Sequence, residues 1–201
     1  ETVSIYAQFI DIEPSAGIIA SEFCCRWKGI VMLILASRSP RRIDLLNRAG
    51  VEFEIKPSDS DETPVPGETP EEQALRLATV KAVDIAEKYG QGNIVLGADT
   101  IVVIDGRTLG KPRDRAEGRQ MLETLSGRPH VVITGVCIIC PDGRRITKAV
   151  HSSVSFRSLS AGEIEKYLDT GEPFDRAGSY AIQGIGAFLI DRVDGSYTNV
   201  V

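Results

Sequence analysis

The sequence contains few of the residues that hold transition metals. Its 201 residues include two histidines, His130 and His151, and four cysteines, which fall as Cys24-Cys25 and as the pair Cys137 and Cys140. No second Cys/His pair stands at the spacing of a zinc site. Cys137 and Cys140 lie in an apolar alternating segment, where an odd separation sends two side chains to opposite faces of a strand. We therefore predict no zinc site, no disulfide, and four free thiols in a reducing cytoplasm.

The sequence also lacks a long apolar run and an excess of positive charge. Its apolar runs are far shorter than the roughly 20 residues that a membrane-spanning helix needs. Its 23 Lys and Arg residues are outnumbered by 28 Asp and Glu, and the net charge of −5 would repel nucleic acid. We therefore expect neither a membrane protein nor a nucleic-acid-binding protein, and we assign any basic cluster to a small anion.

Length and composition are those of an ordinary globular protein, with 42% apolar and 25% charged residues. The chain is long enough for one α/β domain with a core, or for two small lobes. Residues 1–31 show no sustained periodicity, and they lack the basic start and clean apolar centre of a secretory signal. We expect residues 1–31 to be an upstream extension outside the fold, and residues 32–201 to form the domain.

From Met32 onward, strand and helix patterns alternate. The apolar run 33–37 predicts a strand, and Ser39 and Pro40 are typical of the N-cap and first position of a helix over 40–49, which Gly50 ends. Capping residues predict further helices at 70–89, from Asp114 to Gly127 and from Ser160 to Gly171. Extended segments or strands are predicted at 51–57, 94–104, 130–140, 144–157, 180–183 and 187–193. This order predicts an α/β fold with a mixed sheet and flanking helices.

The segment Ser37-Arg-Ser-Pro-Arg-Arg42 indicates an anion site. Arg41 and Arg42 fall in the first turn of the predicted helix, where the helix dipole disfavours each cation by a few tenths to about 1 kcal/mol. Free backbone N–H groups and two guanidinium groups at this end suit a polyanion, most simply a phosphate chain. The alternative is two solvated surface arginines.

Two charged residues interrupt segments whose pattern predicts burial. Lys81 follows Leu77 by four residues on the apolar stripe of helix 70–89, where it needs an anion nearby or must snorkel to the rim. Asp99 interrupts the apolar strand 94–104, where an ionised carboxylate is costly unless it is paired, protonated or bound to metal. Asp99 is therefore either a general base or metal ligand, or a structural carboxylate that caps backbone N–H groups.

Three further polar residues complete the candidate set. Glu62 closes an acidic loop at 58–62 and could be a second ligand for a hard metal ion. Lys111 stands in a loop that could reach a phosphate, although its spacing from Gly106 is not that of a P-loop. The amide of Gln183 could recognise a nucleobase edge or be structural. Cations for a triphosphate, carboxylates for a metal ion and water, and an amide for a base suit one task.

Several short motifs occur along residues 32–201 in a characteristic order. They are Ser37-Arg-Ser-Pro-Arg-Arg42, Gly97-Ala-Asp-Thr100, Lys111-Pro-Arg113, the strand from His130 to Thr134-Gly135, Asp175-Arg-Ala-Gly178, Ile182-Gln-Gly184 and Gly195-Ser-Tyr-Thr-Asn-Val-Val201. With these motifs the chain resembles the Maf family of nucleoside triphosphate pyrophosphatases. Residues 1–31 have no counterpart in that family.

The resemblance implies a cytoplasmic, metal-dependent and often dimeric enzyme. Its α/β fold would form two lobes around a cleft similar to that of the inosine triphosphate pyrophosphatases. Such an enzyme cleaves a nucleoside triphosphate between the α and β phosphates, giving monophosphate and pyrophosphate, and so cleans the nucleotide pool. The Ile-Gln-Gly and Gly-Ser-Tyr-Thr-Asn forms resemble the branch that prefers dTTP and UTP, whereas the 7-methyl-GTP branch has a Lys-x-Glu-Gly type of motif.

The resemblance also implies residue roles, motif by motif. Asp99 matches the proton acceptor and is expected to act with Lys81 in catalysis, and Glu62 and Asp99 are expected to hold Mg²⁺ or Mn²⁺. The expected substrate-binding residues are Ser37, Arg41, Arg42, Lys81, Thr100, Lys111 and Gln183, of which Arg41, Thr100 and Gln183 match positions linked to substrate choice.

A second hypothesis belongs to another functional class. The family has an older association with septum inhibition, so the chain could be a nucleotide-binding regulator of septum formation without turnover. The presence of Asp99, Lys81 and Glu62 argues against an inactive enzyme. Nucleotide binding measured beside pyrophosphate release distinguishes the two hypotheses.

Overall fold

A computed structural model describes residues 31–201, so the expectations for Cys24, Cys25 and almost all of the N-terminal extension lie outside the described residues. The described chain divides into two compact units. The first holds residues 31–61, 79–97 and 137–148, and the second holds residues 62–78, 98–136 and 149–201. Each unit is described by itself.

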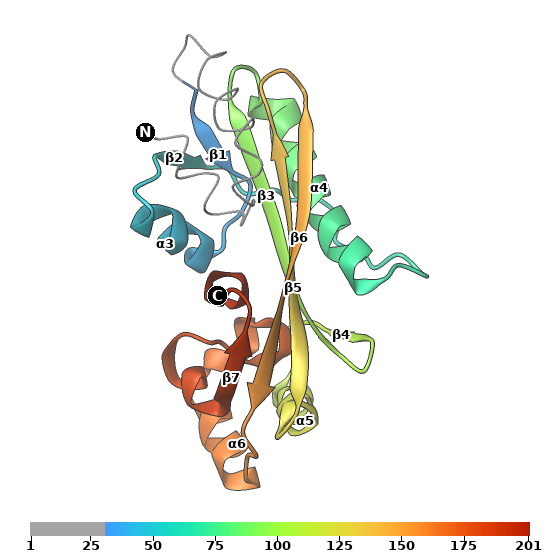
Figure 1. Cartoon of the computed structure of the whole chain (residues 1–201), viewed down its shortest axis with the longest axis vertical. Coiled ribbons are helices and arrows are strands. Elements are labelled where there is room, and N and C mark those ends of the chain that lie inside the picture. Colours follow the sequence, from blue (N-terminus) through green and yellow to red (C-terminus); the bar gives the residue numbers. More distant parts are fainter. Residues whose placement is uncertain (1–30) are drawn as a thin grey trace. The chain divides into compact units, whose positions relative to one another are not determined.

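Strands and helices alternate along the chain, and Figure 1 labels the main elements. The elements are β1 (Leu33–Leu35), α3 (Pro40–Arg48), β2 (Phe53–Ile55), α4 (Pro70–Tyr89), β3 (Ile94–Ile104), β4 (Arg107–Leu109), α5 (Arg115–Leu125), β5 (Pro129–Ile139), β6 (Arg145–Phe156), α6 (Ala161–Asp169), the short 3-10 helices η2 (Glu172–Asp175), η3 (Ala177–Ser179) and η4 (Gly184–Leu189), β7 (Ile190–Asp194) and α7 (Tyr197–Val200).

The strands form one seven-stranded mixed sheet, which confirms the predicted fold class. Its order is β2-β1-β3-β5-β6-β7, and β4 pairs with β3. β1 runs parallel to both β2 and β3, whereas β4 and β7 run antiparallel to β3 and β6. β3, β5 and β6 each contribute residues to both units. No helix within residues 31–201 is long and apolar enough to cross a membrane.

In the first unit, α3 packs against the short buried strand β1. Leu46 of α3 joins Leu33, Leu35 and Val51 in one apolar cluster. The helix ends as predicted, because Gly50 takes the left-handed conformation (φ 68°) just after the C-cap. Its start differs in one respect. Ser39 occupies the N-cap position and Pro40 follows it, but the Ser39 side chain makes no capping hydrogen bond.

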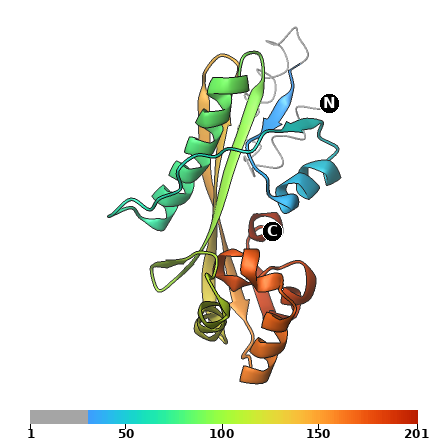
Figure 2. The same cartoon turned by 180° about the vertical axis from the view of Figure 1, so that it is seen from behind.

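In the second unit, α5 and α6 contribute to a larger core. Leu122 and Leu125 of α5 and Leu168 of α6 are almost completely buried in one cluster, and Figure 2 shows these two helices from behind. Both caps form as predicted. Asp114 accepts a hydrogen bond from Glu117 N at 2.8 Å, and Ser160 makes a reciprocal capping box with Glu163.

Two parts of the predicted element pattern are wrong. The turn at Asp105-Gly106 leads into a short strand, β4, antiparallel to β3, which the sequence reasoning missed because it has only three residues. The predicted strand at 180–183 does not form. Its apolar residues are buried without strand pairing, and the next residues enter η4, so β7 begins only at Ile190. Burial of a short apolar run was mistaken for strand structure.

Candidate active site

Each unit contains some of the predicted site residues. Ser37, Arg41, Arg42 and Lys81 belong to the first unit. Glu62, Asp99, Thr100, Lys111 and Gln183 belong to the second unit.

In the first unit, the hydroxyl of Ser37 organises the turn between β1 and α3. Ser37 is buried, and its Oγ accepts hydrogen bonds at 3.2 Å from both the Ser39 backbone N–H and Arg42 Nη1. The hydroxyl therefore binds both the Arg42 guanidinium and the backbone N–H of the N-cap residue Ser39. Ser37 and Arg42, both predicted to bind substrate, are thus in contact.

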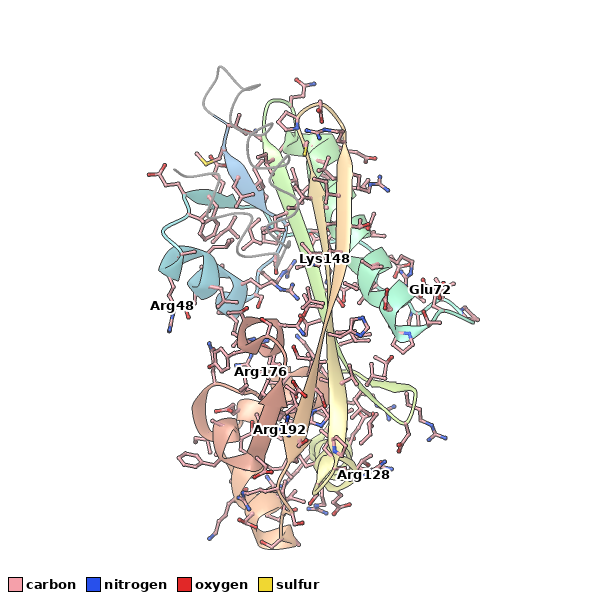
Figure 3. All side chains as sticks on the ribbon, viewed as in Figure 1. Arg48, Glu72, Arg128, Lys148, Arg176 and Arg192 are labelled. Carbon is pink, nitrogen blue, oxygen red and sulfur yellow. The ribbon has the colours of Figure 1, made fainter. Side chains whose placement is uncertain are left out.

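Arg41 and Arg48 stand at opposite ends of α3 and differ in their surroundings. The Nη1 atom of Arg41 is buried and has no hydrogen-bond partner among the described residues. Arg48, labelled in Figure 3, is exposed and pairs with Asp44 at 2.8 Å. A buried guanidinium N–H without an acceptor is costly, and the first turn of α3 contains no acidic residue. The interpretation as a solvated surface arginine suits Arg48 but not Arg41.

Ser58 and Asp59 anchor the start of the acidic loop at 58–62. Ser58 Oγ donates to Asp84 of α4 at 2.7 Å, and Asp59 pairs with Arg38 at 2.6 Å. Glu62, the last residue of the loop, is exposed in the second unit. Asp59 therefore serves a surface ion pair, and Glu62 stays the carboxylate of this loop predicted to bind metal.

Lys81 lies half-buried on α4, as its place on the apolar stripe predicted. Leu77, Ala78 and Ile85 on the same stripe are buried. This partial burial is compatible with both alternatives that the sequence left open, an anion near the ammonium group or a stem that lies along the apolar face.

In the second unit, Asp99 and Thr100 lie half-buried in β3. Thr100 Oγ1 is 2.8 Å from Thr134 Oγ1 of β5, and Thr134 Oγ1 donates to the Asn199 backbone carbonyl at 3.2 Å. Asn199 is itself buried, and its Nδ2 donates to Ser152 Oγ at 2.9 Å. The C-terminal motif is thereby connected to the strand position beside Asp99.

Sequence reasoning missed Thr134 and Asn199 as parts of this network. Both occur within motifs that it quoted, but Thr134 and Asn199 are 65 residues apart in the chain.

Gly135, next to Thr134, shows how closely the backbones of β5 and α4 pack. A Cβ at Gly135 would lie 2.2 Å from the Ala74 carbonyl oxygen of α4, so only glycine fits there.

Lys111 pairs with Asp175, and both side chains are largely exposed. Arg176, labelled in Figure 3, is a second arginine of the kind seen at Arg41. Its Nε atom is buried and has no hydrogen-bond partner among the described residues. Arg176 Nη1 is 3.9 Å from Asp175, and burial lowers the pKa of Arg176. Two cations therefore surround one exposed carboxylate, and sequence reasoning had identified only Lys111.

Gln183 is half-buried at the start of η4. Within the part of the chain that the structure describes, no hydrogen bond occupies its side-chain amide. Its donor and acceptor are therefore both available for a ligand.

The histidines do not suit a metal site. His130 is buried and lies 2.7 Å from the Tyr180 hydroxyl through Nε2, and burial lowers its pKa to about 4. His151 pairs with Glu71 at 2.9 Å in an exposed setting. Cys137 and Cys140 are buried free thiols whose pKa burial raises.

Oxygen donors remain as candidate metal ligands. Across residues 31–201, no three His, Cys, Asp or Glu side chains gather to hold a metal ion on their own. Mg²⁺ usually binds through one or two carboxylates and completes its shell with waters and substrate phosphates. Glu62 and Asp99, which lie in the same unit, fit this chemistry.

Several known proteins are similar to this chain. A family model described as "Maf-like protein" matches residues 32–201. The chain is 51% identical over 172 residues to the dTTP/UTP pyrophosphatase of Geotalea uraniireducens (strain Rf4), covering 84% of this chain and 87% of the relative. It is 52% identical over 170 residues to the dTTP/UTP pyrophosphatase of Syntrophus aciditrophicus (strain SB), covering 84% and 82%. Among solved structures, the Staphylococcus aureus Ham1 protein is 16% identical with a TM-score of 0.48, covering 85% of this chain and 86% of that chain.

Proposed function

Because the chain belongs to the Maf family, we propose that it hydrolyses nucleoside triphosphates, preferring dTTP and UTP, to the monophosphate and pyrophosphate. The observation that carries this proposal is the 51% identity, over 84% of the chain, to a relative named dTTP/UTP pyrophosphatase. We assign the activity to residues 32–201. A cytoplasmic location, a role in cleaning nucleotide pools and a homodimeric state rest on the family resemblance.

The proposed phosphate-binding residues are Ser37, Arg41, Arg42 and Lys81 of the first unit and Lys111 of the second. The buried Arg41 Nη1 supports this role, because a phosphate oxygen would supply the acceptor that the described residues do not. Planar guanidinium groups suit phosphate oxygens, and the start of α3 adds backbone N–H donors. Lys111 leaves Asp175 when phosphate replaces that carboxylate.

Asp99 accepts the proton of the water that attacks the phosphate chain. Its second oxygen leaves it able to share a metal ion with Glu62. Mg²⁺ or Mn²⁺, when bound by Glu62 and Asp99, supplies charge neutralisation at the phosphate oxygens. Lys81 stabilises the negative charge that develops as the α–β bond breaks.

Gln183 recognises the base. Its amide offers one donor and one acceptor group, which match O4 and N3–H of uracil or thymine. The amide makes no hydrogen bond to the residues that the structure describes, which supports this role. The resemblance links both Arg41 and Thr100 to substrate choice. We assign Arg41 to the phosphates and Thr100 to the base, and the hydrogen bond between Thr100 and Thr134 holds Thr100 in place.

A pyrophosphate-release panel over common and modified nucleoside triphosphates, with Mg²⁺ and with Mn²⁺, tests the proposal. We expect the highest kcat/KM with UTP and dTTP, and loss of activity in excess EDTA that added Mg²⁺ restores. Full activity in EDTA would contradict the metal assignment. Calorimetric UTP binding without pyrophosphate release would favour the regulator of septum formation instead.

A further inference from the structure

Gln183 lies in the middle of a loop, residues 181–186. Two side chains accept hydrogen bonds from the backbone of this loop, one before Gln183 and one after it. Glu172 accepts hydrogen bonds at 3.0 Å from the backbone N–H groups of Ile185 and Gly186. The Tyr167 hydroxyl accepts one from Ala181 N at 3.2 Å. The same hydroxyl donates to Glu172 Oε1 at 2.9 Å. Glu172 and Tyr167 therefore form one hydrogen-bonded pair, here called the clamp, that holds the loop on both sides of Gln183.

The glycines of the loop make room for the carboxylate. A Cβ at Gly184 would lie 2.6 Å from Glu172 Oε2, and Gly184 has φ 78°, which favours glycine. A Cβ at Gly186 would lie 2.3 Å from the Ala181 carbonyl oxygen and 2.5 Å from the Tyr167 hydroxyl. The loop backbone therefore packs closely against the Glu172–Tyr167 pair at both glycines.

The clamp itself is held by the end of α6. The Tyr167 side chain is buried, and burial together with the Glu172 carboxylate raises its pKa, so the hydroxyl keeps the proton that it donates. Glu172 N donates to Thr170 Oγ1 at 3.2 Å, and Thr170 Oγ1 donates to the Tyr167 carbonyl at 2.6 Å. Hydrogen bonds to an ionised group are the stronger class, so the loop backbone is fixed where Gln183 leaves it.

We propose that Glu172, supported by Tyr167, is a positioning residue that fixes the Gln183 loop and thereby sets the preference for uracil and thymine over purines. This inference rests on the proposed function, because it concerns how the base is recognised. The backbone at residue 183 sets where the Gln183 side chain starts and therefore which positions its amide can reach. Discrimination by such a group depends on that backbone being held near the productive geometry.

The test uses Glu172→Gln and the milder Tyr167→Phe in the full chain, with Glu123→Gln as the matched control. Glu123 is an exposed carboxylate on α5 outside the loop. We expect Glu172→Gln to lower the UTP-to-GTP ratio of kcat/KM by about tenfold, mainly through a higher KM for UTP, because a hydrogen-bonded carboxylate is lost. Tyr167→Phe shifts the ratio in the same direction, and Glu123→Gln leaves it unchanged.

A double variant separates positioning from a general structural effect. If Glu172 acts through Gln183, Glu172→Gln adds little to the loss of selectivity in Gln183→Ala, because coupled residues are not additive. Equal losses of kcat/KM for UTP and GTP, or an unchanged ratio in Glu172→Gln beside a lowered one in Gln183→Ala, would overturn the positioning role alone. An unchanged ratio in Gln183→Ala would instead overturn the proposed base recognition. If Glu172→Gln fails to fold, Tyr167→Phe decides, since it removes one hydroxyl and keeps the ring packing.

Discussion

The arginine segment (residues 37–42) in the first unit and the Gln183 loop (residues 181–186) in the second are built from contacts of different range. Arg42 and Ser37, which hold the arginine segment, are five residues apart. Glu172 and Gly186, which hold the loop, are 14 apart. The arginine segment offers charge from a local turn, whereas the loop offers an amide whose direction depends on distant side chains. With the proposed roles, phosphate affinity and base choice would have separate structural origins.

The largest expected effect comes from Asp99→Asn in the second unit. Loss of a general base costs on the order of 10²–10⁴ in rate, while we expect nucleotide affinity to stay within about tenfold because the first-unit cations are untouched. Single-turnover pyrophosphate release and calorimetric UTP binding measure the two quantities. Near-normal turnover would remove Asp99 from this role.

Arg41→Ala tests whether the arginine segment contributes to nucleotide affinity rather than to thermal stability. We expect the affinity for UTP and for GTP to fall alike, by about tenfold or more, because a hydrogen bond between charged groups is lost. Thermal stability should not fall, since the change removes a buried nitrogen without a described partner and a cation from the first turn of α3. Arg48→Ala on the same helix is the control and should leave binding unchanged. A selective loss of UTP binding would place base choice in the first unit.

The core of the second unit should lose stability in mild acid through His130. Its pKa is lowered from 6.5 to about 4 by burial, so the unfolded chain takes up a proton in this interval and the folded chain does not. The free energy of unfolding should therefore fall by up to about 1.4 kcal/mol for each pH unit as pH drops from 6.5 towards 4.

Urea denaturation across this interval measures the slope. His130→Gln should reduce it, whereas the exposed His151 serves as the control through His151→Gln. Identical slopes in the wild type and His130→Gln would show that His130 does not titrate between the folded and unfolded states as described.

The smallest effects come from two serine caps, one in each unit. Ser160→Ala breaks a complete capping box and should cost about 1 kcal/mol. Ser39→Ala should cost much less, because the Ser39 side chain makes no capping hydrogen bond. Chemical denaturation of both variants checks the difference. Equal costs would mean that Ser39 caps α3 after all.

The elements that were predicted correctly are marked by residues that lie close together in the sequence, such as a capping box or an apolar run. The capping box at Thr69 and Glu72 forms, and the helix predicted over 70–89 is observed as Pro70–Tyr89. The strand 94–104 is also observed with those bounds, since an apolar run of this length leaves little choice. By contrast, β4 has three residues and depends on its pairing with β3, and no local sequence pattern predicts that pairing.

The candidate site follows the same rule. Arg41 and Arg42 were found because two cations at a helix start contradict the dipole, and Lys81 and Asp99 because each interrupts an apolar pattern. Glu172 and Tyr167 contradict no local rule, so nothing marked them before the loop's hydrogen bonds were visible. Arg176 was missed because its burial depends on tertiary packing. The roles assigned to the predicted residues remain predictions.

The ratio of kcat/KM for UTP to that for GTP, compared between the wild type and Gln183→Ala, tests most directly the claim that base choice lies in the second unit. Loss of the amide leaves the uracil edge unpaired and costs about 1–3 kcal/mol for each neutral group. The account predicts a large fall in kcat/KM for UTP, a small change for GTP and a flattened preference. An unchanged ratio would contradict the account and make Gln183 structural, with Arg41 or Thr100 the next residues to test.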